Sequence, residues 1–212
     1  MPEYQTMTEM AATQLRKAIM MGDLPPGTRL IPVKLENELN LSRVSIREAI
    51  RELSGSALVE TVMNVGAHVA SPPSLDEIKE IFEVRLLVEP KLAAQASKNI
   101  SDEGVSILEG LYQEMESDPQ PGRNFFMLNR EFHQTLYLAS GRRFLCRIVS
   151  QFMDQILLFR SRGTRSQFDF HATNLEHQQI IEAIRAGNVK EIKAKTVSHI
   201  KRGLADIIRR ST

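Results

Sequence analysis

Three histidines and one asparagine in the second half of the chain have the types and spacing of a metal site. Asn129 and His133 are four residues apart on one predicted helix, so both side chains can point to the same spot. His177 and His199 lie on two later predicted helices, each among apolar residues. Imidazole suits zinc, nickel or another late divalent ion, and three nitrogen ligands leave coordination positions open for water or a carboxylate. Spacing alone does not show that the histidines converge, and each taken singly also fits a hydrogen-bonded histidine of the core.

The same histidines would suit a helical metalloenzyme that activates a water molecule for hydrolysis. Such an enzyme needs a general base beside the metal, and the sequence contains no HExxH or comparable pattern. Glu131 and Glu176 neighbour two candidate ligands, but adjacent helix positions point away from each other. A hydrolase is therefore the alternative function, and we expect the protein not to be an enzyme.

Three arginines in the first half form a stripe that could bind DNA. Arg43, Arg47 and Arg51 recur every fourth residue, on one face of a helix predicted to start at Ser42. A guanidinium group can grip a phosphate or the O6 and N7 atoms of guanine, and a helix fits the major groove. Because residues near the start of such a helix reach the bases best, Arg43 and Arg47 are stronger candidates than Arg51.

The polar neighbours of these arginines allow two interpretations. Ser42 and Ser45 could donate hydrogen bonds to phosphates near the positive end of the helix dipole. Alternatively, the face is merely solvated, and Glu48 and Glu52 pair with the arginines. The turn and hairpin signals that surround this helix favour DNA binding.

The elements of the first region follow the order of a winged helix-turn-helix. Apolar residues at helical or alternating spacing, with capping residues, prolines and glycines between them, mark each element. In chain order the sequence predicts a helix that begins with a Thr6 and Glu9 capping box and ends at Gly22, a proline turn over 23–27, a helix over about 33–39, a helix from Ser42 to about Leu53, and a hairpin over 57–70.

The second region is predicted to contain only helices. The Ser71-Pro72-Pro73 segment is stiff and places a domain boundary after residue 72, giving domains 1–72 and 73–212. Pro90 should kink or interrupt the first long helix. The fold class is therefore mostly α, with an N-terminal winged helix-turn-helix followed by an all-helical bundle of about six helices. In chain order the helical segments begin at a Ser74 and Glu77 capping box and then cover about 102–117, 124–139, 143–159, 170–186 and 188–210.

Composition excludes several classes of protein. With 212 residues, 42% hydrophobic and 25% charged, the chain is neither disordered nor fibrous. A net charge of +1 means that any nucleic acid must bind to a local basic patch. No apolar run is long enough to span a bilayer and the first residues lack a signal-peptide pattern, so we expect a cytoplasmic protein with no membrane partner. The single cysteine, Cys146, is expected to be a buried small hydrophobe.

The first region resembles the GntR family of bacterial transcription regulators. The resemblance rests on the LPPGTRL run at 24–30, the LSRVSIREAIREL run at 41–53, and the LVE and NVGAHV runs at 58–60 and 64–69. It implies a winged helix-turn-helix that binds a palindromic DNA operator as a homodimer, with Arg29, Arg43, Arg47 and the wing tip at Gly66 near the DNA. Asn40 and Ala57 stand where the family usually has glycine, and asparagine can take the positive φ that glycine supplies.

The second region resembles the FCD effector domain of the FadR subgroup. The resemblance rests on the EVRLLVEP run at 83–90, the NREFH run at 129–133, and the EH and SH pairs that end at His177 and His199. It implies that Asn129, His133, His177 and His199 hold a divalent metal, zinc or nickel, and that Arg85 binds the carboxylate of a small effector. The alternative for Arg85 is a surface ion pair with Glu89, four residues further on.

Together these features predict a ligand-responsive transcription regulator whose DNA affinity is controlled by a small carboxylate effector in a metal-containing pocket. A third interpretation is an architectural DNA-binding protein whose helical bundle only dimerises. Its affinity for DNA would not respond to any effector.

Overall fold

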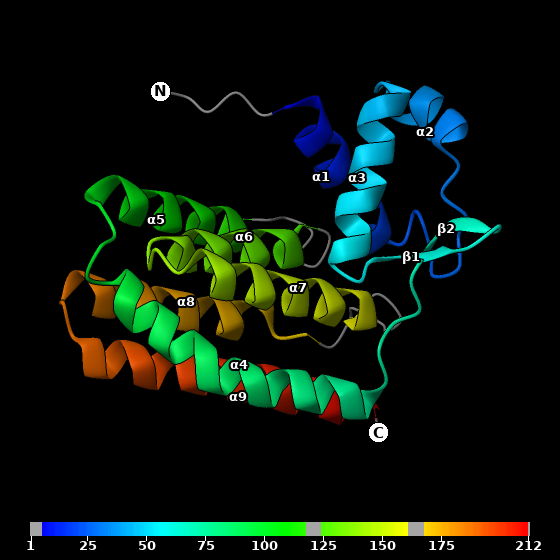
Figure 1. Ribbon diagram of the computed structural model, residues 1–212. Helices are drawn as coiled ribbons and strands as arrows, with labels where there is room; N and C mark the ends of the chain where they lie inside the picture. Colours follow the sequence, from blue (N-terminus) through cyan, green and yellow to red (C-terminus); the bar gives the residue numbers. More distant parts are fainter. Residues whose placement is uncertain (1–5, 118–123, 161–167, 212) are drawn as a thin grey trace. The chain divides into compact units, whose positions relative to one another are not determined.

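The computed structural model of the chain describes residues 6–117, 124–160 and 168–211 (Figure 1). These ranges contain nine helices and one two-stranded sheet, which confirms the predicted fold class. The chain forms two compact units, one made of Met1–Pro73 with Gln151–Arg162 and the other of Ser74–Ser150 with Gly163–Thr212.

The N-terminal part contains three helices and a hairpin at the predicted places. Thr6 and Glu9 form the expected capping box on the first helix, and Gly22 ends it with a φ of 83°. Between the second and third helices, Asn40 takes the left-handed conformation with a φ of 52°, as predicted for an asparagine in place of glycine. The elements are α1 (Met7–Met21), α2 (Pro32–Leu39), α3 (Arg43–Gly55), β1 (Val59–Val62) and β2 (Gly66–Val69).

Helix α3 is the centre of this unit because α1, α2 and β1 all pack on it. Its buried face consists of residues spaced three and four apart, so the opposite face is left for polar side chains. The buried residues of α1 come from the same kind of stripe and include Leu15 and Ile19. The apolar side of α3 is Ile46, Ala49, Ile50 and Leu53.

The hairpin is an antiparallel pair in which Val59 lies opposite Val69 and Val62 lies opposite Gly66. A third segment extends it, because Arg29 bridges to His68 and the Leu30 amide donates to the Ala67 carbonyl over 2.8 Å. The loop between the strands turns at Asn64 and Gly66, whose φ values are 65° and 105°. This is the wing, and its base is fixed on both sides by backbone hydrogen bonds.

Ala57 carries local strain that a single substitution should release. Its φ of 57° costs an L residue about 1–2 kcal/mol, and its side chain is exposed, so glycine would remove nothing else. Because glycine loses roughly 0.5–1 kcal/mol more chain entropy on folding, we expect Ala57→Gly to raise the free energy of unfolding by about 0.5–1 kcal/mol. Thermal or urea denaturation of the full chain measures this change.

Asn64→Gly is the matched control, since Asn64 has a similar φ but asparagine tolerates that region. Its unfolding free energy should change by less than about 0.5 kcal/mol. A stability of Ala57→Gly at or below that of the natural chain would contradict the strain argument.

Six helices follow the hairpin, as predicted. Ser74 and Glu77 form the expected capping box at the start of the first of them. Pro90 lies inside this helix, which runs unbroken through it, so the expected interruption does not occur. The helices are α4 (Leu75–Ala96), α5 (Asp102–Ser117), α6 (Phe125–Leu138), α7 (Arg143–Arg160), α8 (Phe170–Arg185) and α9 (Val189–Ser211).

In the second unit, α4 packs against α6 and α9, α5 packs against α6 and α8, and α8 packs against α9 (Figure 1). The core between them is apolar and includes the rings of Phe82 and Phe132. Cys146 is buried, as predicted, and its Sγ contacts the Tyr137 carbonyl oxygen at 3.1 Å. Among the described residues, no helix combines the length and apolar character needed to cross a membrane.

Candidate functional site

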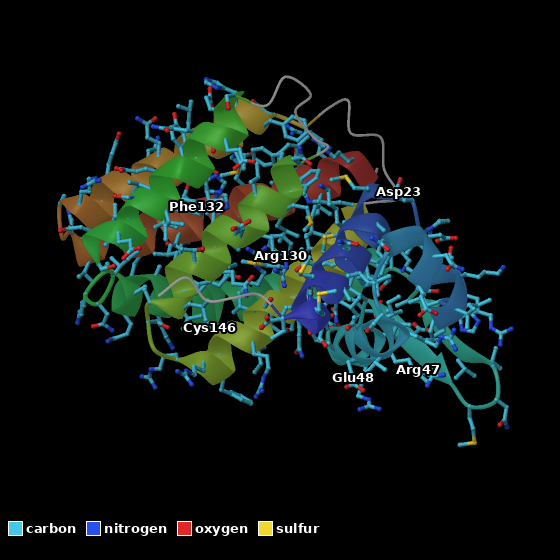
Figure 2. All side chains as sticks on the ribbon, turned by 90° about the horizontal axis from the view of Figure 1, so that it is seen from above. Asp23, Arg47, Glu48, Arg130, Phe132 and Cys146 are labelled. Carbon is cyan, nitrogen blue, oxygen red and sulfur yellow. The ribbon has the colours of Figure 1, made fainter. Side chains whose placement is uncertain are left out.

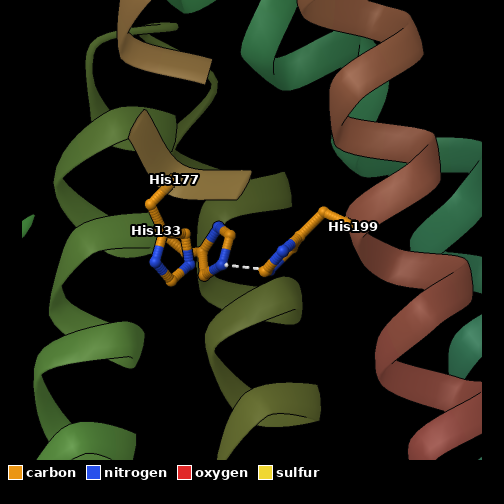
Figure 3. Close-up of side chains that lie close together, drawn as sticks. All are labelled: His133, His177 and His199. Atoms are coloured by element: carbon orange, nitrogen blue, oxygen red, sulfur yellow. Dashed lines mark hydrogen bonds between the residues drawn. The ribbon is translucent and has the colours of Figure 1, made fainter. Parts of the chain in front are cut away.

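Three buried histidines converge inside the second unit. His133 of α6, His177 of α8 and His199 of α9 each offer a ring nitrogen, and these atoms lie within 4.8 Å of one another (Figure 3). The Nε2 atoms of His133 and His199 are 3.0 Å apart. The structure therefore brings together three residues that the sequence places on three separate helices.

Two of the histidines have outer hydrogen-bond partners that accept and cannot donate. Glu176 Oε2 lies 2.9 Å from His199 Nδ1, and Asn174 Oδ1 lies 3.3 Å from His177 Nδ1. Each Nδ1 must then carry the hydrogen, which leaves the lone pair of a neutral ring on Nε2. This second-sphere arrangement is the usual one around histidines that bind a metal.

The cluster leaves two ring nitrogens without a partner. His133 Nδ1 and His177 Nε2 are buried and make no hydrogen bond within the described residues. Burial lowers the pKa of both histidines well below the ordinary value, and the neighbouring His199 lowers each further, so both rings are neutral. A buried polar atom with no partner costs free energy, and a cation bound by the ring nitrogens would supply the missing interaction. Three imidazole nitrogens fit a late divalent ion such as zinc or nickel.

Asn129 lies on α6, one turn before His133, and is half-buried. The side-chain amide of Asn129 makes no hydrogen bond with the described residues. Its role as a fourth ligand remains a prediction.

Arg85 is buried rather than on the surface, and Glu89 occupies one edge of its guanidinium group. Nε lies 2.5 Å from Glu89 Oε1 and Nη2 lies 3.2 Å from Oε2, and the Tyr137 hydroxyl also donates to Oε2 over 2.8 Å. Burial by itself lowers the pKa of Arg85, but the attraction of Glu89 outweighs it and the pKa is raised. The network adjoins the histidines, because the Tyr137 and His133 ring centroids are 5.7 Å apart. Arg85 thus has an internal carboxylate partner, buried instead of the solvated pair considered as an alternative.

Sequence reasoning missed the roles of Asn174 and Glu176. In the sequence Glu176 is a candidate only as a base beside His177, its neighbour in the chain, whereas in the structure its carboxylate contacts His199 on the next helix and Arg202 at 3.4 Å. Nothing in the spacing of Glu176 indicates this contact. Asn174 did carry a signal, because it precedes His177 by three residues on one helix.

The arginine stripe lies on the exposed face of α3, but its members have different partners. Arg43 pairs with Glu36 at 2.9 Å, and Arg51 pairs with Glu48 at 3.2 Å. Glu52 pairs with Arg16 instead of the stripe. Arg47 is exposed and has no ion pair among the described residues; Figure 2 labels it beside Glu48. Arg47 is therefore the member of the stripe that is free to contact a partner.

The serines at the start of α3 differ in exposure. Ser42 is exposed and caps the helix by accepting the Ser45 amide over 3.1 Å. Ser45 is buried, and its hydroxyl lies 2.9 Å from that of Ser42. Only Ser42 can reach a phosphate without rearrangement.

The structure brings Arg29 and the wing tip together. The Arg29 guanidinium lies 3.7 Å from where a Cβ on Gly66 would sit. The wing tip itself is apolar, and Met63 is 86% exposed. Arg29 therefore supplies a positive charge beside a wing loop that has none of its own.

Each half of the chain matches a known protein family. Residues 7–69 match the model of the family described as "Bacterial regulatory proteins, gntR family", and residues 80–202 match the model of the FCD domain. The Bacillus subtilis regulator LutR is 26% identical over 203 residues, covering 86% of this chain and 92% of its own. The NanR repressor of Klebsiella aerogenes is 24% identical over 218 residues, covering 92% of this chain and 83% of its own. The solved structure of Escherichia coli McbR/YncC has the same fold, with a TM-score of 0.78, 19% identity, and 98% and 99% of the two chains covered.

Proposed function

This chain belongs to the FCD-containing part of the gntR family of bacterial regulatory proteins, and from that premise we propose how it works. It binds a palindromic DNA operator as a homodimer, and a small carboxylate effector in a metal-containing helical pocket controls that binding. Its relatives are transcriptional regulators and not enzymes. The observation that carries the effector pocket is the cluster of three buried histidines with two unpartnered ring nitrogens.

The N-terminal domain, residues 1–72, contacts the DNA. Arg47 reaches a base edge or a phosphate from the exposed face of α3, with Arg43, Ser42 and Arg29 in support. The ion pairs of Arg43 and Arg51 are exposed, so exchanging a glutamate for a phosphate costs little. In a two-fold dimer the two recognition helices lie about 34 Å apart, one turn of DNA. Arg51 and Gly66 complete the surface, and Ser45 supports it from beneath through its hydroxyl contact with Ser42.

The C-terminal domain, residues 73–212, holds the metal and the effector. His133, His177 and His199 provide the nitrogen ligands, and Asn129 provides an amide oxygen from the same face of α6 as His133. Bound there, a zinc or nickel ion supplies a positive charge and open coordination positions for a carboxylate. Because no ligand in this set is anionic, an anionic effector is favoured.

Arg85 anchors a carboxylate beside the histidines. Glu89 occupies the Nε and Nη2 edge of the Arg85 guanidinium, and Nη1 of Arg85 has no hydrogen-bond partner among the described residues. The effector either takes this free edge or displaces Glu89, which Tyr137 would still hold through its hydroxyl. Both routes couple effector binding to the α4 and α6 helices that carry these residues.

Control of DNA binding requires that the effector bind more tightly to one state of the protein than to another. The test is the affinity of the purified full chain for the DNA upstream of its own gene, with zinc or nickel, across a panel of small mono- and dicarboxylic acids. We expect at least one acid to change that affinity by roughly 5- to 150-fold, the usual range of allosteric coupling.

His133→Ala should bind the same DNA with unchanged affinity and lose the response to the acid. If the whole panel leaves the affinity of the natural chain unchanged, effector control is wrong and the bundle serves only to dimerise the protein.

A further inference from the structure

Asn174 is fixed in one orientation by two acceptors on α5. Its Nδ2 donates to the Tyr112 carbonyl oxygen over 3.1 Å and to Glu116 Oε2 over 2.8 Å. A carbonyl and a carboxylate oxygen only accept, so the amide nitrogen must face α5. The amide oxygen then faces the other way, towards His177 Nδ1 at 3.3 Å.

We propose that Asn174 is a positioning residue for His177, which holds the imidazole in the form that presents Nε2 as a ligand atom. This inference rests on the metal site of the proposed function and adds to it a residue outside the ligand set. Since Asn174 Oδ1 accepts, His177 Nδ1 carries the hydrogen and Nε2 carries the lone pair. Without Asn174 the His177 ring could carry its hydrogen on either nitrogen. In the molecules that carry it on Nε2, that atom has no lone pair with which to bind a metal.

The burial of the pair makes the arrangement effective. Asn174 is 1% exposed and His177 is fully buried, so water does not compete for Oδ1 or for Nδ1. Nε2 of His177 is also buried and has no partner among the described residues. The ring is thus held at one nitrogen while its other nitrogen faces the histidine cluster.

Glu116 acts on His177 indirectly, through Asn174. The hydrogen bond from Asn174 is the first cause of its lowered pKa, and His171 also contacts it, with Nδ1 2.7 Å from Oε1. An ionised Glu116 accepts strongly from Asn174 Nδ2 and so locks the amide against a flip. A chain of hydrogen bonds therefore connects Glu116 of α5 through Asn174 of α8 to His177 on the same helix.

The competing explanation is that Asn174 merely ties α5 to α8. Gln178 makes a comparable tie, because the Tyr112 hydroxyl donates to its Oε1 over 3.3 Å, and within the described part of the chain its side chain makes no hydrogen bond to a histidine. Gln178→Ala is therefore the matched control for a lost hydrogen bond between the same two helices.

The experiment measures the zinc affinity of the full chain by competition with a chelator, together with the position of the imidazole hydrogen in the metal-free protein. Loss of an outer partner of a ligating histidine typically weakens metal binding by about 10- to 100-fold, and we expect that loss for Asn174→Ala. Gln178→Ala should stay within about twofold of the natural chain, a change of roughly 0.4 kcal/mol. Long-range proton–nitrogen NMR spectra should show the hydrogen on Nδ1 of His177, assigned with His177→Gln.

A second variant guards against a folding defect in Asn174→Ala. Asn174→Asp combined with Glu116→Gln reverses the hydrogen bond between the two side chains and keeps an acceptor towards His177, although it leaves a carboxylate oxygen facing the Tyr112 carbonyl oxygen. Zinc affinity should therefore exceed that of Asn174→Ala. Equal zinc affinities for Asn174→Ala and Gln178→Ala, or a hydrogen on Nε2 of His177 in the natural chain, would overturn the proposal. If the natural chain binds no zinc, the metal site fails, and the spectrum alone decides whether Asn174 sets the imidazole hydrogen.

Discussion

Replacing His133 or His177 with alanine should abolish stoichiometric metal binding, while protein purified without a histidine tag should hold about one metal per chain when zinc or nickel is supplied. Each substitution removes one of three converging ring nitrogens from a buried site. The loss in affinity should therefore exceed the roughly 10- to 100-fold that removal of an outer partner causes. Metal analysis of the dialysed protein and chelator competition measure the two quantities.

Either substitution should change the stability of the metal-free chain much less than it changes metal binding. His133 and His177 each have a buried ring nitrogen with no hydrogen-bond partner in the described part of the chain, so an alanine removes an unsatisfied polar atom along with the packing of the ring. His68→Ala removes a histidine from the wing and is the control for metal content, which it should leave unchanged. A natural chain that takes up no zinc, nickel or manganese would refute the site and leave Arg85 as the only anchor for an effector.

Arg47→Ala should weaken operator binding by about 10- to 100-fold, the equivalent of roughly 1–3 kcal/mol for a well-placed contact with a base or phosphate. Arg47 is exposed on α3 and has no internal ion pair among the described residues, so its guanidinium pays no cost to leave a partner. If it contacts a phosphate, the slope of log affinity against log salt should fall by about 0.9. Fluorescence anisotropy at several salt concentrations gives both values.

Two arginine variants calibrate this result. Arg185→Ala removes an exposed arginine that pairs with Glu109 in the C-terminal part, and it should leave the affinity unchanged. Arg51→Ala removes a stripe member that is already paired with Glu48, so its effect should be smaller than that of Arg47→Ala. Unaltered binding and an unaltered salt slope for Arg47→Ala would show that α3 is not the DNA-contacting surface.

The helices and the hairpin were predictable from the sequence because their signals are local. A capping box fixes the starts of α1 and α4, a glycine ends α1, and apolar residues at helical spacing identify each buried face. The positive φ of Asn40 followed from its place between two short helices. Pro90 is the exception: its local preference favours a break, yet α4 continues through it because the surrounding bundle buries the helix on both sides of the proline.

The order of the elements, the family resemblance and the residue types of both candidate surfaces follow from the amino-acid sequence alone. Which side chains meet depends on the tertiary structure. Three histidines from three helices converge, Glu176 contacts His199 of the next helix although His177 is its neighbour in the chain, and Glu89 takes one edge of a buried Arg85. The physical reason is that apolar periodicity fixes which face of a helix is buried, whereas the packing of all the helices together sets how each is rotated and shifted against its neighbours. Contacts between polar groups on different helices depend on that rotation and shift, to which no local signal in the chain corresponds.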